Sequence, residues 1–301
     1  MLKEEIQKLK KEKNAILLAH YYVPEDVQDI ADFVGDSFAL AKKAKETEAD
    51  IIVFAGVRFM GESAKILNPD KKVLMPDMEA DCPMAHMADV NKVKEMRETV
   101  KDLAVVCYVN STAELKTVSD VCVTSSNAMQ IVEKLPNENI YFIPDQHLAS
   151  FVKAKLTNKN IILNEGYCAT HHALTKEDVL KAKEQHPQAL VLVHPECKSE
   201  VVQCADYAGS TAGILNYARQ SDQSEFIIGT EMGVLYELKK QNPDKTFYLM
   251  SDKLVCDNMK KVTLDKVYEC LDKEINEIEL DPETMTKAAG AMDRMLELTK
   301  S

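Results

Sequence analysis

Three cysteines recur at nearly equal intervals along the 301-residue chain, and their residue type suits them to hold a metal centre. Cys82, Cys168 and Cys256 are separated by 86 and 88 residues. Three thiolates can ligate three irons of a 4Fe-4S cluster and leave the fourth iron open as a Lewis acid. Zinc with three cysteines and one water is the competing interpretation, although thiolate-rich zinc sites are more often closed and structural.

Other polar residues repeat in the same register. Intervals of 17 residues join His20 to Ser37, Tyr108 to Ser125 and His194 to Thr211, and Tyr22, Asn110 and Glu196 lie two residues after the first member of each pair. A histidine at the end of a strand is often structural, but the matched positions favour function. Tyr22, His20 and Glu196 are therefore candidates for general acid and base, and a closed cavity can shift their proton affinities toward neutrality.

Three hydroxyl residues precede predicted helices. Ser37, Ser125 and Thr211 could serve as ordinary N-caps. A helix N-terminus with a hydroxyl is also an anion site, and both roles can coexist. Three such sites facing one cavity would suit a substrate with several carboxylate or phosphate groups, even in an acidic protein.

The remaining cysteines carry a simpler interpretation, because a single cysteine is more often a buried small apolar residue than a ligand. Cys107, Cys122, Cys197, Cys204 and Cys270 have no matching set and are predicted to be structural. The motif Cys168-x-x-His171-His172 resembles half of a zinc site, but no second pair with suitable spacing supports it.

The elements that position these residues also repeat three times. Each segment contains three apolar strands, predicted at 15–19, 51–54 and 72–75, at 103–107, 140–143 and 160–163, and at 189–193, 226–228 and 246–249. Helical stretches and a small polar turn separate the strands. Alternating strands and helices indicate βαβ units with parallel sheets and right-handed crossovers.

The predicted fold class is α/β, with three three-layer αβα domains related by a pseudo-threefold axis. We expect residues 1–100 to form the first repeat with an N-terminal helix, 101–187 the second, and 188–301 the third with a C-terminal helical tail. Ligands of parallel sheets bind beyond the carboxyl ends of the strands. Inward-facing strand ends would bring all the repeated residues into one central active site.

Composition excludes several functional classes. A formal net charge of -12 disfavours nucleic acid as a partner, and the Lys-rich start at 3–13 is predicted to be a solvated amphipathic helix. No segment resembles a signal peptide or a membrane span, so we expect a cytoplasmic protein. In a reducing compartment, eight cysteines are not expected to form disulfides.

The ordered motifs resemble the quinolinate synthase family over essentially the whole chain. The matching stretches are Ala19-His20-Tyr21-Tyr22, Gly35-Asp36-Ser37, Tyr108-Val109-Asn110-Ser111, Ser125-Ser126-Asn127-Ala128, His194-Pro195-Glu196-Cys197 and Gly209-Ser210-Thr211. The resemblance implies a triangular triplicated fold around a 4Fe-4S cluster. It also implies condensation of iminoaspartate (iminosuccinate) with dihydroxyacetone phosphate to quinolinate in de novo NAD biosynthesis, with functional coupling to L-aspartate oxidase or aspartate dehydrogenase.

The same resemblance assigns roles to residues. It implies cluster ligation by Cys82, Cys168 and Cys256, and acid–base roles for Tyr22, His20, Glu196 and His172, of which His172 has no equivalent in the other repeats. It implies substrate contacts from His20, Ser37, Tyr108, Asn110, Ser125, His194, Glu196 and Thr211, with the backbone of Val109 and Pro195 nearby. Some members carry Cys-x-x-Cys-x-x-Cys at the last ligand; Cys256-Asp257-Asn258-Met259 does not, which argues against a redox disulfide there.

Three other functions compete with this interpretation. A zinc-dependent lyase or hydrolase could use the same three cysteines. A redox or iron-sensing protein would need a fourth protein ligand, for which the repeats offer no candidate. A repeat protein without a cluster would use the triplication only for packing.

Overall fold

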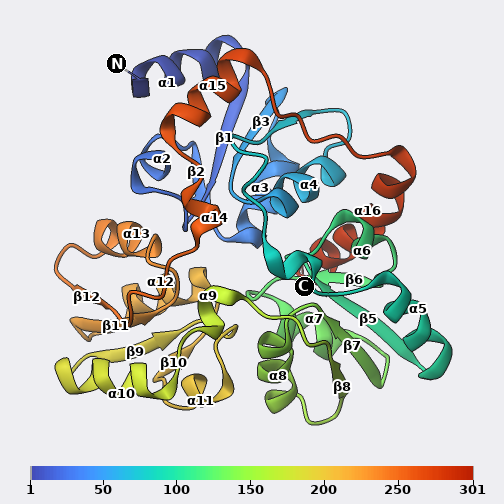
Figure 1. Ribbon diagram of the computed structural model, residues 1–301, viewed down its shortest axis with the longest axis vertical. Helices are drawn as coiled ribbons and strands as arrows, with labels where there is room; N and C mark the ends of the chain where they lie inside the picture. The colour runs from blue at the N-terminus through green and yellow to red at the C-terminus, as the bar shows by residue number, and fades with distance from the viewer. Residues whose placement is uncertain (1, 301) are drawn as a thin grey trace.

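The computed structural model describes residues 2–300, which form three similar α/β units around a common centre (Figure 1). Each unit contains one four-stranded parallel sheet with helices packed against it, so the predicted α/β class with three αβα units is confirmed. The strand order is the same in all three, β2-β1-β3-β4, β6-β5-β7-β8 and β10-β9-β11-β12. The triplication in the sequence is therefore a triplication of structure.

The elements of each unit follow one sequence of helices and strands. The first unit comprises α1 (Leu2–Glu12), β1 (Ala15–His20), α2 (Glu25–Ile30), β2 (Phe33–Gly35), α3 (Ser37–Glu46), β3 (Ile51–Ala55), α4 (Arg58–Leu67), β4 (Lys72–Leu74) and the 3-10 helix η1 (Pro83–His86). The second comprises α5 (Val90–Thr99), β5 (Leu103–Tyr108), α6 (Ala113–Thr117), β6 (Val121–Val123), α7 (Ala128–Lys134), β7 (Asn139–Ile143), α8 (Gln146–Lys155), β8 (Asn160–Leu163) and α9 (Ala169–His172).

The third unit is followed by a helical tail. It comprises α10 (Lys176–Gln185), β9 (Leu190–Val193), α11 (Ser199–Val202), β10 (Tyr207–Ala208), α12 (Thr211–Gln220), β11 (Glu225–Gly229), α13 (Val234–Gln241), β12 (Thr246–Leu249) and α14 (Asp257–Lys260). The tail contains α15 (Leu264–Lys273) and α16 (Pro282–Leu298). The three sheets lie within 1–100, 101–187 and 188–301, while α10 precedes residue 188 and holds the place that α1 holds in the first unit.

The prediction of three strands per unit was wrong, because each sheet has a fourth, edge strand. These strands, β2, β6 and β10, are only two or three residues long, too short to show a period of two. An aspartate precedes each of them. The Asp32 carboxylate accepts from Leu17 N–H at 2.8 Å, and Asp120 and Asp206 accept from Val105 and Val191, each at 2.7 Å.

The expected N-capping by Ser37, Ser125 and Thr211 was also wrong. The caps of α3 and α12 are the preceding residues, since Asp36 accepts from Ala39 N–H at 3.0 Å and Ser210 from Gly213 N–H at 3.1 Å. The N-cap of α7 is Asn127. All three predicted hydroxyls are therefore left for other partners.

The carboxyl end of the fourth strand of each unit, β4, β8 or β12, leads to a ligand candidate. Cys82, Cys168 and Cys256 are the N-cap residues of η1, α9 and α14. These short helices, which the sequence pattern did not predict, give the three cysteines the same place in each unit.

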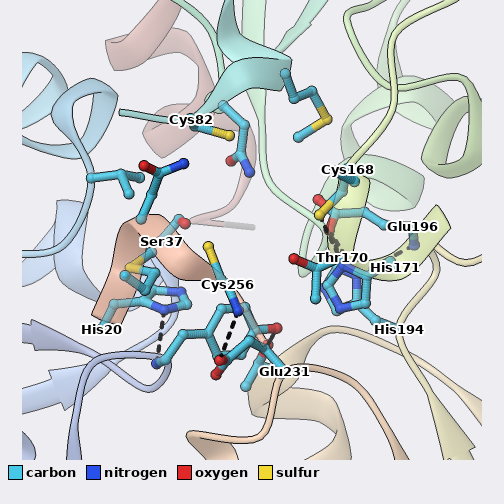
Figure 2. A pocket seen from close by; sticks show the side chains of 18 of the residues that line it. His20, Ser37, Cys82, Cys168, Thr170, His171, His194, Glu196, Glu231 and Cys256 are labelled. Carbon is cyan, nitrogen blue, oxygen red and sulfur yellow. Dashed lines mark hydrogen bonds and ion pairs between the residues drawn. The ribbon is translucent and has the colours of Figure 1, made fainter. Parts of the chain in front are cut away.

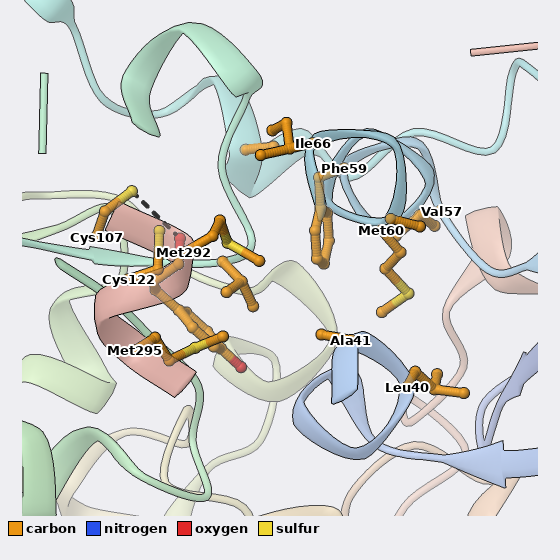
Figure 3. Close-up of a cluster of buried hydrophobic side chains, with 14 of the residues drawn as sticks. Leu40, Ala41, Val57, Phe59, Met60, Ile66, Cys107, Cys122, Met292 and Met295 are labelled. Carbon is orange, nitrogen blue, oxygen red and sulfur yellow. Dashed lines mark hydrogen bonds between the residues drawn. The ribbon is translucent and has the colours of Figure 1, made fainter. Parts of the chain in front are cut away.

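The tail ties the units together. Helix α15 packs on α1, and α16 packs on α4, α6 and β6. Between these helices, Met75 N–H donates to Asn276 O at 3.0 Å and Ile278 N–H donates to Val73 O at 2.8 Å. Figure 3 shows Met292 and Met295 of α16 beside the buried side chains of the first two units, whose cores form one continuous cluster.

None of the helices within residues 2–300 is long and apolar enough to cross a membrane.

Candidate active site

A cavity of about 330 Å³ lies where the carboxyl ends of the three sheets meet. This is the edge at which parallel sheets usually bind ligands. All three units line it, through His20, Tyr22, Asp36, Ser37, Cys82, Tyr108, Asn110, Ser125, Cys168, His171, His194, Glu196, Thr211, Glu231, Lys253 and Cys256 among others. The convergence of three polar strand ends is thus a property of the pseudo-threefold fold.

The three cysteine side chains reach this cavity from three directions (Figure 2). Each comes from a different unit, and each is half-buried. Burial raises the pKa of Cys82 to about 12, and it also raises the pKa of Cys168 and of Cys256. Three enclosed thiols of this kind need a cation or metal beside them to become thiolates.

A buried cluster of two histidines and a carboxylate lies beside Cys168. The ring of His171 stacks on that of His194 with 4.7 Å between centroids. His171 Nδ1 lies 2.7 Å from Glu196 Oε2, and His194 Nδ1 lies 3.4 Å from the same oxygen. Burial favours the neutral acid, but His194 and His171 outweigh it and lower the pKa of Glu196. Glu196 is therefore a carboxylate at neutral pH.

Four further groups of the cavity are neutral at pH 7. Burial lowers the pKa of His20 and of His194 to about 3. Burial raises the pKa of Tyr22 and of Tyr108 well above 10. The cavity thus offers protonated phenols as donors and the Glu196 carboxylate as an acceptor.

A chain of hydrogen bonds connects Tyr22 with Glu196. The Tyr22 hydroxyl lies 2.7 Å from both Thr211 Oγ1 and Thr230 Oγ1, and Thr230 Oγ1 lies 2.9 Å from His171 Nε2. When His171 Nδ1–H donates to Glu196, Nε2 must accept from the Thr230 hydroxyl, which can accept from Tyr22. The order of partners gives a continuous path for a proton.

Three buried oxygens of the cavity lining have no partner in the protein. Among the described residues, Asn110 Oδ1, Thr124 Oγ1 and Glu196 Oε1 are buried without a hydrogen-bond partner. All three residues line the cavity. Because an unpaired buried acceptor costs free energy, these oxygens fit donors that a bound molecule would supply.

The structure brings most of the predicted site residues together. His20, Tyr22, Ser37, Cys82, Tyr108, Asn110, Ser125, Cys168, His194, Glu196, Thr211 and Cys256 all line the cavity. Among the described residues, Val109, Pro195 and His172 are not part of this lining. His172 Nδ1 instead lies 2.8 Å from His147 Nε2, and its ring packs on Tyr167 with 4.3 Å between centroids.

Three residues in or beside the cavity were not predicted from the sequence: His171, Thr230 and Glu231. His171 adjoins His172, but it has no equivalent in the other repeats and so gave no register signal. Thr230 and Glu231 directly follow β11, the place where the fold concentrates polar groups. The rule that ligands bind at strand ends, applied to β11 as well as to β9, could have found Thr230 and Glu231.

The donor set fits an iron-sulfur cluster better than a single ion. Cysteine thiolates are the usual ligands of such clusters, and this site offers three cysteines, one from each unit. Cys168, His171 and Glu196 also lie within 4.8 Å of one another, as a single metal would require. However, His171 and Glu196 already satisfy each other by hydrogen bonding, and that set leaves out two of the converging cysteines.

The fold and site define a triplicated α/β enzyme with a thiol-lined cavity at its centre. Residues 4–297 match the family model described as quinolinate synthetase A protein. Quinolinate synthase of Caldicellulosiruptor bescii is 54% identical over 99% of this chain and 98% of its own length. Those of Alkaliphilus metalliredigens and Methanosarcina barkeri are 50% and 48% identical, over 98% and 97% of this chain and 97% and 96% of their own lengths. The chain belongs to the quinolinate synthase family.

Proposed function

We propose that this chain condenses iminoaspartate (iminosuccinate) with dihydroxyacetone phosphate to quinolinate, releasing phosphate and two waters, in de novo NAD biosynthesis. The observation that supports this most directly is the convergence of Cys82, Cys168 and Cys256 on one cavity that also holds Tyr22 and Glu196. The full-length similarity to quinolinate synthases supports the same reaction.

In this proposal Cys82, Cys168 and Cys256 hold one 4Fe-4S cluster with one open iron. When bound, such a cluster supplies a Lewis acid for dehydration. Half-buried thiols around a mostly apolar cavity wall match the soft, enclosed environment that these clusters require.

Glu196 and Tyr22 take the acid–base roles. Glu196 is ionised and accepts a proton from the condensing substrates, while Tyr22 keeps its proton and donates it to a departing oxygen. Thr230 and His171 connect the two residues. When the His171 proton lies on Nε2, every hydrogen bond of the chain runs toward Tyr22, so a proton taken up at Glu196 can return to Tyr22. His171 thereby fills the role that the sequence analysis gave to His172.

Substrate carboxylates are held by neutral donors. His20, Ser37, Tyr108, Asn110, Ser125, His194 and Thr211 line the cavity. Val109 and Pro195 adjoin lining residues in the sequence, and in this proposal their backbone groups add to the substrate contacts. Ser37 and Thr211 open the ten-residue helices α3 and α12, whose N-termini favour anions. Among the described lining residues, Lys253 is the only lysine or arginine, so binding relies on dipoles more than on charge.

The supply of the unstable imine calls for an L-aspartate oxidase or aspartate dehydrogenase, because those reactions form it from aspartate. An oxygen-sensitive cluster and eight free cysteines suit the reducing cytoplasm.

A zinc-dependent lyase or hydrolase with the same three cysteines is the alternative. The close grouping of Cys168, His171 and Glu196 favours a single ion in this cavity, although it includes only one of the three cysteines. The test is anaerobic purification and reconstitution, followed by metal analysis and a quinolinate assay with freshly generated iminoaspartate. Product that depends on iron and sulfide supports the proposal. Zinc without iron, or a reconstituted protein that forms no quinolinate, would overturn it.

A further inference from the structure

Two buried carboxylates occupy the same position in the second and third units. Asp145 follows β7 by two residues and Glu231 follows β11 by two residues. Both side chains are fully buried, with no exposed surface. Burying a carboxylate is costly unless it is paired or hydrogen-bonded, so each must have a structural reason.

Each carboxylate binds the backbone of the ligand cysteine in its own unit. Asp145 Oδ2 accepts from Cys168 N–H at 3.2 Å, and Glu231 Oε1 accepts from Cys256 N–H at 3.1 Å. The second oxygen of each side chain binds a different N–H, that of Leu148 for Asp145 and that of Gly233 for Glu231, both at 2.7 Å. Each side chain therefore clamps a cysteine loop to the end of the third strand of its unit, β7 or β11.

Glu231 extends this clamp to the proposed acid. Lys260 Nζ lies 2.8 Å from Glu231 Oε1 and donates to the backbone oxygen of Tyr22 at 2.6 Å. The third unit thus joins Cys256 and Tyr22 through one ion pair between buried Glu231 and partly exposed Lys260.

The first unit departs from this pattern. Val57 occupies the position of Asp145 and Glu231, and Cys82 N–H donates instead to Asp81 Oδ1 at 2.8 Å. Asp81 is partly exposed and also pairs with His86. The loop is held to the sheet by a backbone bond of 2.8 Å from Arg58 N–H to Ala80 O.

We propose that Asp145 and Glu231 are positioning residues that fix the loops of Cys168 and Cys256 for cluster ligation. This inference rests on the proposed function, since it assigns a role toward the 4Fe-4S cluster. Groups that orient metal ligands are worth about 10- to 100-fold in metal retention. Their role is distinct from that of Glu196 and Tyr22, because both oxygens of each side chain already bind backbone N–H groups of the cysteine loop and its neighbour.

The variant Asp145→Ser separates positioning from general stability. Serine can still cap α8 by accepting from Leu148 N–H, but it is too short to reach Cys168 N–H as well. Asp89→Ser is the matched control, because Asp89 caps α5 through Asn91 N–H and does not bind a cysteine in the described structure. Glu231→Gln gives an independent second variant.

The measurement is the rate at which the reconstituted holoenzyme loses iron to an excess of chelator, beside the thermal midpoint of the metal-free protein. We expect Asp145→Ser and Glu231→Gln to lose iron at least about tenfold faster than the unsubstituted protein, with Asp89→Ser unchanged. Equal rates of iron loss in all four proteins would overturn the inference. It would also be overturned if Asp89→Ser and Asp145→Ser lost iron equally fast and lowered the thermal midpoint of the metal-free protein by the same amount. An unsubstituted protein that takes up no iron and sulfide would overturn the proposed function itself.

Discussion

At the scale of single residues, burial and hydrogen bonding divide the acid–base candidates into two kinds. Tyr22, His20 and His194 are kept neutral by burial. His194 and His171 hold the pKa of Glu196 below its ordinary value, so Glu196 is ionised. Tyr22 is a protonated phenol and Glu196 is an ionised carboxylate, and two side chains separate them along the hydrogen-bond chain. This difference in protonation makes directed proton transfer between them feasible.

Replacing Glu196 with Gln should therefore slow turnover while the metal centre stays intact. Glutamine keeps the shape of the side chain but cannot take a proton, so we expect kcat to fall at least about 100-fold. Iron and sulfide content should not change. Glu200→Gln, a substitution at an exposed position on α11, is the control and should behave as the unsubstituted protein. Normal turnover in Glu196→Gln would remove Glu196 from the chemistry.

Acid should destabilise the metal-free protein through its buried histidines. The pKa of His20 falls from 6.5 to about 3 on folding, so below pH 6.5 the unfolded chain binds a proton that the folded protein does not. Stability is then fully present above pH 6.5 and decreases, by up to about 1.4 kcal/mol per pH unit for this residue, as the pH falls. Urea unfolding at pH 6.5 and 5 should show a smaller decrease for His20→Gln. An identical pH dependence would contradict the assigned neutral state of His20.

At the scale of elements, the sequence predicted the strands that have a continuous apolar run and did not predict the short edge strands. The long strands such as β1 and β5 were found because their apolar runs are continuous. The edge strands β2, β6 and β10 were missed, because a strand of two or three residues is held by its neighbours and not by its own pattern.

The aspartate before each edge strand should carry part of the stability of its sheet. Asp206→Ala leaves the N–H of fully buried Val191 without its carboxylate partner, and we expect a loss of about 1–3 kcal/mol in the free energy of unfolding. Asp206→Asn keeps an oxygen acceptor and should lose much less. Chemical denaturation measures both. Equal stabilities for the two variants would show that this hydrogen bond does not hold the strand.

The site shows the same division between pattern and packing. The residues that repeat in register, such as the three cysteines, were predicted from the sequence and line the cavity. His171 and Thr230 were not predicted, because each occurs in one unit only. Their importance arises from contacts between distant segments, and Thr230 meets Tyr22 across 208 positions of sequence.

At the scale of the whole molecule, the C-terminal tail makes one body of the first two units. Helix α16 leaves the third unit and packs between α4 of the first and α6 of the second. The last helix of the 188–301 segment therefore packs on the first two units and not on the sheet of the third unit. Unfolding of this helix should weaken both units at once.

Met292→Ala tests this coupling. Met292 is fully buried on α16, and truncating it should lower the free energy of unfolding by about 2–5 kcal/mol. Because the helix contacts both units, fluorescence and circular dichroism should still report one shared transition. Glu297→Ala, at an exposed position on the same helix, is the control. An unfolding free energy equal to that of the unsubstituted protein, or two separate transitions already in the unsubstituted protein, would contradict coupling of the units through α16.

The central claim is that three units each give one cysteine to a single cluster. The most direct test measures iron and acid-labile sulfide per chain after anaerobic reconstitution of the unsubstituted protein, of Cys82→Ala, Cys168→Ala and Cys256→Ala, and of the control Cys204→Ala. We predict about four irons and four sulfides for the unsubstituted protein and the control, and loss of the intact cluster in each of the other three. Zinc in place of iron, or a full cluster in any one of the three variants, would contradict the account.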